Sequence, residues 1–276
     1  MTKTALVTGA ASGIGKAIAT GLAREGYHVV VLVRNEARGE ETLRDIRATV
    51  PNASLETLTA DLSSQSSIRE AAAIFLSRHQ KLDVLVNSAG VFVKNREVTN
   101  DGLERTFATN YMAYFLLTNL LVEALKKGAP SRVVNVASQY GGAKVDFDDL
   151  QLETRKYSYL RATPPTMLER VLFTQELAER LKGTGVVVNC LHPGLVSGTR
   201  LLNDTGGFFQ WMTNMVGTTP EKGADTALWL ATAPENATVT GKMFAKRKEV
   251  KTPGQGSDPA ARKRLWEASE RLAKLK

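Results

Sequence analysis

The chain has 276 residues, 43% hydrophobic and 23% charged, which suits one globular α/β domain. Its single cysteine, Cys190, excludes a disulfide framework, and no apolar run approaches the ~20 residues of a spanning helix, so we expect a cytoplasmic protein. The net charge of +8 comes without a nucleic-acid-binding motif, and the three histidines are scattered, so we expect neither a nucleic-acid partner nor a metal site.

Strand-like and helix-like segments alternate along the chain. Short apolar runs predict strands at 4–8, 28–33, 55–59, 84–87, 132–136, 186–191 and 241–244. Periodic segments predict helices at 13–25, 35–50, 64–79, 102–127, 166–182 and 221–231. This alternation predicts right-handed βαβ units and a Rossmann-type, doubly wound parallel sheet in a three-layer α/β/α single domain.

Two segments near the C-terminus differ from this pattern. A loop at about 195–220 carries the apolar residues Phe208, Phe209, Trp211 and Met212. We expect it to cover a bulky hydrophobic substrate, although the same residues could form a subunit contact in a homodimer or homotetramer. The last 35 residues hold eleven Lys/Arg against four Asp/Glu, and we expect a basic, solvated helix over about 258–276.

A glycine-rich turn follows the first predicted strand. Gly9, Gly13 and Gly15 would let the backbone approach a pyrophosphate, and the helix that begins beside Ser12 and Ile14 would present free N–H groups to it. This placement in a βαβ unit predicts a dinucleotide site. The second strand ends in Arg34, with no acid for a ribose 2′-hydroxyl, so we predict NADP(H) rather than NAD(H).

Further motifs are Asp61-Leu62 after the third strand, 87–90 (Asn-Ser-Ala-Gly), Asn110, Ser138 and Pro193-Gly194. With the glycine-rich turn they resemble the short-chain dehydrogenase/reductase family over residues 3 to about 272, and the phrases at 34–39 and 171–174 look closest to its retinol-dehydrogenase-like branch. The resemblance implies that Asp61 and Leu62 contact the adenine and that Asn87, Ala89 and Gly90 line the ribose side. It also implies roles near the nicotinamide for Asn110, which would hold a water of the proton relay, for Ser138, which would bind the substrate carbonyl, and for Pro193 and Gly194.

The departures from the family pattern lie in the proton-transfer machinery. The positions of the catalytic tyrosine and lysine fall at Thr163 and Met167, and the cofactor-amide threonine falls at Gly198, with Thr199 one residue late. Thr163 is a far weaker acid than a phenol, and methionine carries no charge. The pair Pro164-Pro165 suits the first turn of a helix, with Thr163 as its N-cap.

Other side chains could supply the proton. Tyr140, two residues after Ser138, is the first candidate, followed by Tyr157 and Tyr159. A shifted register would pair Tyr157 with Arg161, but it breaks the match that follows. Asp146, Asp148 and Asp149 more often form a rim, and His192 more often packs behind the cofactor than reacts.

Three functions therefore stay open. The first is an NADP(H)-dependent reductase with an atypical site, acting on a hydrophobic iminium or activated enone. The second is a cyclase, isomerase or dehydratase that keeps the scaffold and works by orienting a reactive substrate. The third is a catalytically silent protein that senses NADP(H).

Overall fold

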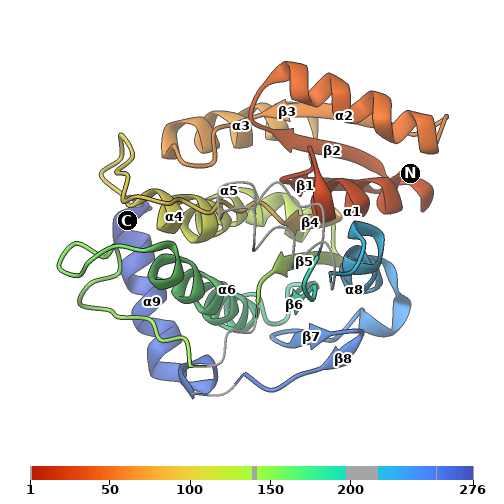
Figure 1. Cartoon of the computed structure of the whole chain (residues 1–276). Coiled ribbons are helices and arrows are strands. Elements are labelled where there is room, and N and C mark those ends of the chain that lie inside the picture. Colours follow the sequence, from red (N-terminus) through yellow and green to blue (C-terminus); the bar gives the residue numbers. More distant parts are fainter. Residues whose placement is uncertain (1, 139–141, 197–216, 253, 276) are drawn as a thin grey trace.

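One eight-stranded sheet organises the computed structural model, which describes residues 2–138, 142–196, 217–252 and 254–275 (Figure 1). The strands follow the order β3-β2-β1-β4-β5-β6-β7-β8, and all neighbours are parallel except β7 and β8. Their bounds are Thr4–Thr8 (β1), His28–Val33 (β2), Leu55–Thr59 (β3), Val84–Asn87 (β4), Ser131–Val136 (β5), Val186–His192 (β6), Met243–Ala245 (β7) and Lys248–Glu249 (β8).

Helices cover both faces of this sheet. One apolar core joins it to α1, α2 and α8, and a second joins it to α3, α5, α6 and α9, which lies beside α6 (Figure 1). Within the described residues no helix is long and apolar enough to cross a bilayer. The helical bounds are Gly13–Arg24 (α1), Glu36–Thr49 (α2), Gln65–Arg78 (α3), Arg105–Phe107 (α4), Ala113–Lys127 (α5), Tyr159–Arg180 (α6), Pro220–Thr232 (α8) and Pro259–Leu272 (α9).

The Rossmann-type doubly wound fold predicted from the alternating pattern is confirmed. Strands such as β2 are buried on both faces, which explains their continuous β-branched sequence. Polar side chains mark helix starts, since Asn35 and Ser64 accept main-chain N–H groups of the first turns of α2 and α3. The lone Cys190 is buried in β6, and burial raises the pKa of its thiol to about 12.

The long helix predicted at 102–127 is interrupted. A π-helical turn at Ala108–Met112 separates α4 from α5. Asn110 lies in this turn, and its side-chain amide both accepts from and donates to the main chain of Val91, at 2.7 and 3.0 Å. The amide satisfies two otherwise unpaired main-chain groups, so the bulge joins the helix to the segment that follows β4.

The predicted start of the next helix is wrong. Helix α6 begins at Tyr159 after the N-cap Ser158, so Thr163 is no cap and both prolines lie inside the helix. Without N–H groups, Pro164 and Pro165 leave the carbonyls of Leu160 and Arg161 without helical donors. Leu160 and Arg161 are exposed residues in the first turn of the helix.

Candidate active site

The glycine-rich turn between β1 and α1 packs closely against neighbouring backbone. Gly9 has φ +67°, and a Cβ there would lie 2.8 Å from the Cα of Ala89. At Gly15 a Cβ would lie 2.3 Å from the carbonyl oxygen of Gly9, so neither position accepts a side chain. Ser12 precedes α1, but its hydroxyl makes no capping hydrogen bond. The backbone cradle and this uncommitted hydroxyl fit an anion such as a pyrophosphate.

Helix α1 is anchored through the remaining residues of the predicted turn. Gly13 has φ +54°, and the partly buried Ile14 packs against the core shared by α1 and α8. Thr8, at the end of β1, accepts the main-chain N–H groups of Ser88 and Ala89 through its hydroxyl, at 2.9 and 3.1 Å. The turn is therefore held against the segment that follows β4.

Two charged residues follow the ends of β2 and β3. Arg34, just after β2, is exposed and forms no ion pair with another described residue. Burial alone would raise the pKa of Asp61, but hydrogen bonds from Ser63 and the nearby Arg34 charge, among others, lower it below its ordinary value. Leu62 is half buried against the core. The structure thus brings Arg34 and Asp61 into the same electrostatic neighbourhood.

A buried chain of polar side chains runs beneath the site. Asn87 in β4 donates to Thr118 in α5 at 3.0 Å and to Asn135 in β5 at 2.9 Å. Asn135 in turn donates to Thr174 in α6 at 2.9 Å. All four residues have no exposed surface. This chain sets the position of α6 against the two central strands.

Arg170 is a site residue that the sequence analysis missed. Its buried guanidinium donates to the carbonyl oxygens of Asn110, Val136 at 2.8 Å and Ala89 at 3.1 Å. It also lies 4.2 Å from the ring centroid of Tyr114. The one signal in the sequence is its spacing, because Arg170 falls on the same face of the helix as Thr163, Met167 and Thr174, where a charged residue is unexpected.

The relay positions implied by the resemblance are closed. Thr163 and Met167 lie one turn apart on α6 and are buried. The Thr163 hydroxyl has no hydrogen-bond partner among the described residues. The carbonyl of Asn110, the residue expected to hold a water, accepts from Nε of Arg170. The Arg170 guanidinium, three residues after Met167 on α6, therefore contacts the main chain of the residue expected to serve the relay.

Ser138 is paired with an imidazole. Its hydroxyl lies 3.1 Å from Nδ1 of His192, at the adjacent carboxyl ends of β5 and β6. Burial lowers the pKa of His192, which favours the neutral ring at pH 7. Pro193 and Gly194 follow directly, with Gly194 at φ +84°. The Ser138 hydroxyl and the His192 imidazole therefore form a polar pair at this edge of the sheet.

The remaining tyrosine candidates have different outcomes. Tyr140 lies outside the described residues, as do Thr199 and the apolar residues of the 195–220 loop. Tyr157 precedes α6, and its hydroxyl contacts Thr106, the Val93 carbonyl and Glu104. Burial above all raises its pKa. The shifted register is thus disfavoured, because Tyr157 is not on the helix that carries Arg161.

Tyr159 begins α6 and packs edge-on against Phe92, with ring centroids 6.3 Å apart. Gly90, in the predicted ribose segment, is half buried between Ala89 and Val91.

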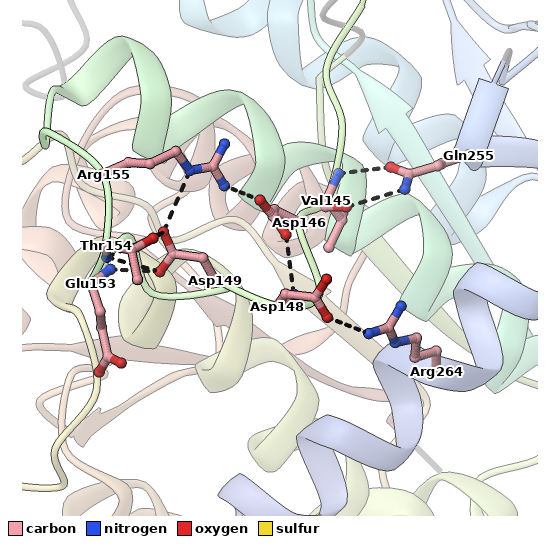
Figure 2. Close-up of polar contacts among 9 residues, drawn as sticks. All are labelled: Val145, Asp146, Asp148, Asp149, Glu153, Thr154, Arg155, Gln255 and Arg264. Atoms are coloured by element: carbon pink, nitrogen blue, oxygen red, sulfur yellow. Dashed lines mark hydrogen bonds and ion pairs between the residues drawn. The ribbon is translucent and has the colours of Figure 1, made fainter.

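A cavity of about 560 Å³ adjoins the N-terminal half of α6. Its outer wall is the loop after β5, shown in Figure 2, where Arg155 pairs with Asp146 and with Asp149 at 3.4 Å. Asp148 pairs with Arg264 of α9 at 2.7 Å, so the loop is bound to the C-terminal helix. The predicted acidic rim is therefore an ion-paired wall, and Asp146 and Asp149 line the cavity.

The histidines are less scattered in space than along the sequence. His28 and His79 approach the same oxygen of Glu56, at 3.3 and 2.8 Å. These three groups could together contact a metal ion, which corrects the expectation from sequence spacing. Arg78 holds the other oxygen of Glu56 at 2.7 Å, so the carboxylate is already neutralised.

Comparison with known proteins identifies the family and agrees with the fold. Residues 3–148 match the family model described as short chain dehydrogenase. Human retinol dehydrogenase 13 is 39% identical over 99% of this chain and 85% of its own length. Human retinol dehydrogenase 14 is 36% identical over 99% of this chain and 87% of its own length.

Solved structures agree. A putative uncharacterized protein from Mycobacterium paratuberculosis aligns with TM-score 0.81 and 30% identity, covering 99% of this chain and 93% of that one. Actinorhodin polyketide ketoreductase with NADPH (28% identity) and a Brucella melitensis 3-ketoacyl-(acyl-carrier-protein) reductase with NADH (27%) both give 0.68, covering 88% of this chain and 95% of theirs. The chain therefore belongs to the short-chain dehydrogenase family of nicotinamide-dependent oxidoreductases, in its retinol-dehydrogenase-like branch.

Proposed function

We propose that this protein is an NADP(H)-dependent reductase that works without a phenolic proton donor. One observation supports this proposal above all: on α6 the two positions of the family's proton relay, Thr163 and Met167, are buried, and Arg170 donates to the Asn110 carbonyl. Neither relay position offers a group with a pKa near neutrality. A reaction that needs no proton at the moment of hydride transfer fits this arrangement.

The chemistry of the acceptor follows from that requirement. NADPH, when bound, supplies a hydride. An iminium carbon that receives a hydride becomes a neutral amine, so no acid has to act in that step. An activated enone gives a stabilised enolate that solvent can protonate later. A simple ketone gives an alkoxide, which requires an acid near neutral pH. We therefore propose a bulky, hydrophobic iminium or activated enone as the substrate.

Ser138 and His192 have a positioning role in this proposal. In the tautomer of neutral His192 that carries its proton on Nδ1, this N–H donates to the Ser138 oxygen at 3.1 Å, so the hydroxyl hydrogen of Ser138 can donate to a polar atom of the substrate. Replacing Ser138 by alanine removes that donor, and we expect a higher KM with a smaller effect on kcat.

The choice of NADP(H) rests on Arg34. Its exposed guanidinium lies after β2, where a ribose 2′-phosphate could accept two hydrogen bonds. Charge-assisted hydrogen bonds contribute ~1.5–3 kcal/mol, so Arg34→Ala should weaken NADPH binding roughly 10–100-fold and NADH binding far less. Fluorescence titration of both cofactors measures this, with the exposed Arg44→Ala as a matched control. Equal losses for NADPH and NADH would refute the assignment.

The decisive experiment compares substrates of matched shape. Purified protein with NADPH is given a bicyclic N-methyl iminium salt and the ketone of the same ring system, and nicotinamide oxidation is followed optically. We expect turnover of the iminium only. The double variant Thr163→Tyr/Met167→Lys should gain ketone reduction. Ketone reduction by the unaltered chain would contradict the proposal.

A second function is distinguished by the same assay. A cyclase, isomerase or dehydratase would convert its substrate with no change in nicotinamide absorbance, with Ser138 orienting a reactive molecule. The lack of an acid at 163 and 167 favours this alternative over ordinary carbonyl reduction. A silent NADP(H) sensor would bind cofactor without converting any substrate.

A further inference from the structure

Glu169 is a buried carboxylate with no role in the site above. It lies on α6 with 1% of its surface exposed, and its Oε2 atom has no hydrogen-bond partner among the described residues. A buried acceptor left without a donor costs ~1–3 kcal/mol. The residue also lines the 560 Å³ cavity between α4, α6 and the loop after β5. An unpaired acid beside an open cavity points to a ligand that donates hydrogen bonds.

The surroundings of Glu169 are rich in acceptors. Glu104, which lines the same cavity, already accepts the N–H groups of Thr106 and Phe107, both at 2.8 Å. The carbonyls of Leu160 and Arg161 lack helical donors because prolines follow four residues later. Leu160 and Arg161 also line the cavity. A ligand with several N–H donors on one atom would match such a set.

The charge and the walls of the cavity narrow the ligand further. The Arg155 charge is already balanced by Asp146 and Asp149, and Arg161 donates to the Lys156 carbonyl. Apolar surface comes from Phe107, Leu150, Leu152, Leu160, Pro164 and Pro165. We propose that this cavity binds an alkyl amine in its protonated form, with the ammonium group on Glu169 and the alkyl part against these apolar side chains.

The assignment goes beyond the reduction proposed above and does not depend on it. Glu169 lies on a different face of α6 from Thr163 and Met167, and neither of those residues lines the cavity. The site would therefore hold its ligand whether or not hydride transfer occurs.

Protonation gives the site a measurable signature. Burial above all, then the Glu104 charge, raises the pKa of Glu169 to about 8, and Arg170 acts in the opposite direction. Ammonium binding requires the ionised carboxylate, so at pH 7 it should release close to one proton. An alkyl ammonium keeps its own charge up to pH ~10. Its apparent affinity should therefore be about ten-fold higher at pH 9 than at pH 7.

Other titratable groups around Glu169 have to be considered. Tyr111 in the π turn feels the Glu169 charge, and its own pKa is raised well above its ordinary value, mainly by burial, so it stays neutral over this range. The other charged residues that line the cavity are Glu104, Lys144, Asp146, Asp149, Arg155 and Arg161. Tyr157 contacts Glu104 through its hydroxyl, and Arg170 follows Glu169 on α6.

The test uses the full chain, with hexylamine as the probe and 1-hexanol and hexanoate as controls of equal length. Isothermal titration at pH 7, in two buffers of different ionisation enthalpy, measures affinity and proton release together. We expect saturable binding of hexylamine with proton release and no saturable binding of either control. Glu169→Gln should weaken hexylamine at least ten-fold, whereas Glu179→Gln, an exposed position on the same helix, should not.

Three results would overturn the assignment. The first is hexylamine binding that Glu169→Gln leaves unchanged, and the second is equal binding of 1-hexanol, which would indicate an apolar pocket alone. The third is no saturable binding of hexylamine at pH 9. Because glutamine has the shape of glutamate and needs no desolvated charge, the variant should fold, and its thermal unfolding provides the check.

Discussion

Arg170 is a single residue that connects three segments near the candidate site. Its guanidinium satisfies carbonyls of three separate segments, at Ala89, Asn110 and Val136. Arg170→Met should lower the free energy of unfolding by ~3–5 kcal/mol, because the buried carbonyls lose charged donors. Lysine should restore only part of it, since an ammonium cannot reproduce the planar fork. Urea denaturation measures both, and Arg44→Met is the exposed control. A loss below 1 kcal/mol would contradict this role.

Within helix α6, the proline pair distinguishes a helix that begins at Tyr159 from the predicted helix that begins at residue 164. Proline in a helix interior costs ~3 kcal/mol relative to alanine, whereas in the first turn it costs little. Because α6 begins at Tyr159, Pro164→Ala and Pro165→Ala should each raise the free energy of unfolding by about 1–3 kcal/mol. Loss of proline's restraint on the unfolded chain offsets part of the gain. If urea denaturation shows no increase in the free energy of unfolding of either variant, the helix instead begins at residue 164, as the sequence predicted.

The elements also show how far sequence reasoning reaches. Strands such as β1 and β2 were predicted to the residue, because β-branched runs end sharply at polar or glycine positions. The predicted start of α6 was wrong because it followed the preference of proline for the first turn of a helix, whereas tertiary packing keeps one more turn before the prolines helical. The two-residue strand β8 was missed, since it is exposed and too short to show a period.

The same contrast holds for the candidate site. The glycine turn and Asn87, Ala89 and Asn110 gather at one edge because parallel strands end together. Glu169 and Arg170 were not predicted, since charged residues in a helix usually face water. Their burial depends on what packs against α6, which a single sequence does not state.

For the whole molecule, the buried Glu169 should make stability depend on pH. Its folded pKa of about 8 lies above the ordinary value of 4.5. Below pH 4.5 both states bind the proton, and between the two values the unfolded state releases it while the folded state keeps it. Stability should therefore fall by up to ~1.4 kcal/mol per pH unit as pH rises through this window. Glu169→Gln should remove that slope, whereas Glu40→Gln, on exposed α2, should keep it. Parallel slopes for wild type and Glu169→Gln would show that the carboxyl is ionised when folded.

The buried chain from Asn87 through Asn135 to Thr174 has a consequence for how the family can diversify. Asn87 lies opposite Asn135, and Asn135 opposite Cys190, in adjoining strand pairs. A slip of one residue would turn Asn135 to the other face of the sheet, and it would leave the buried Asn87 amide without this acceptor and the buried Thr174 hydroxyl without its donor. Only one alignment of the central strands escapes that penalty. Thr174 lies about two turns or more after Thr163 and Met167 on α6. Substitutions at those earlier positions could therefore accumulate in evolution without disturbing the hydrogen bonds that fix the central strands.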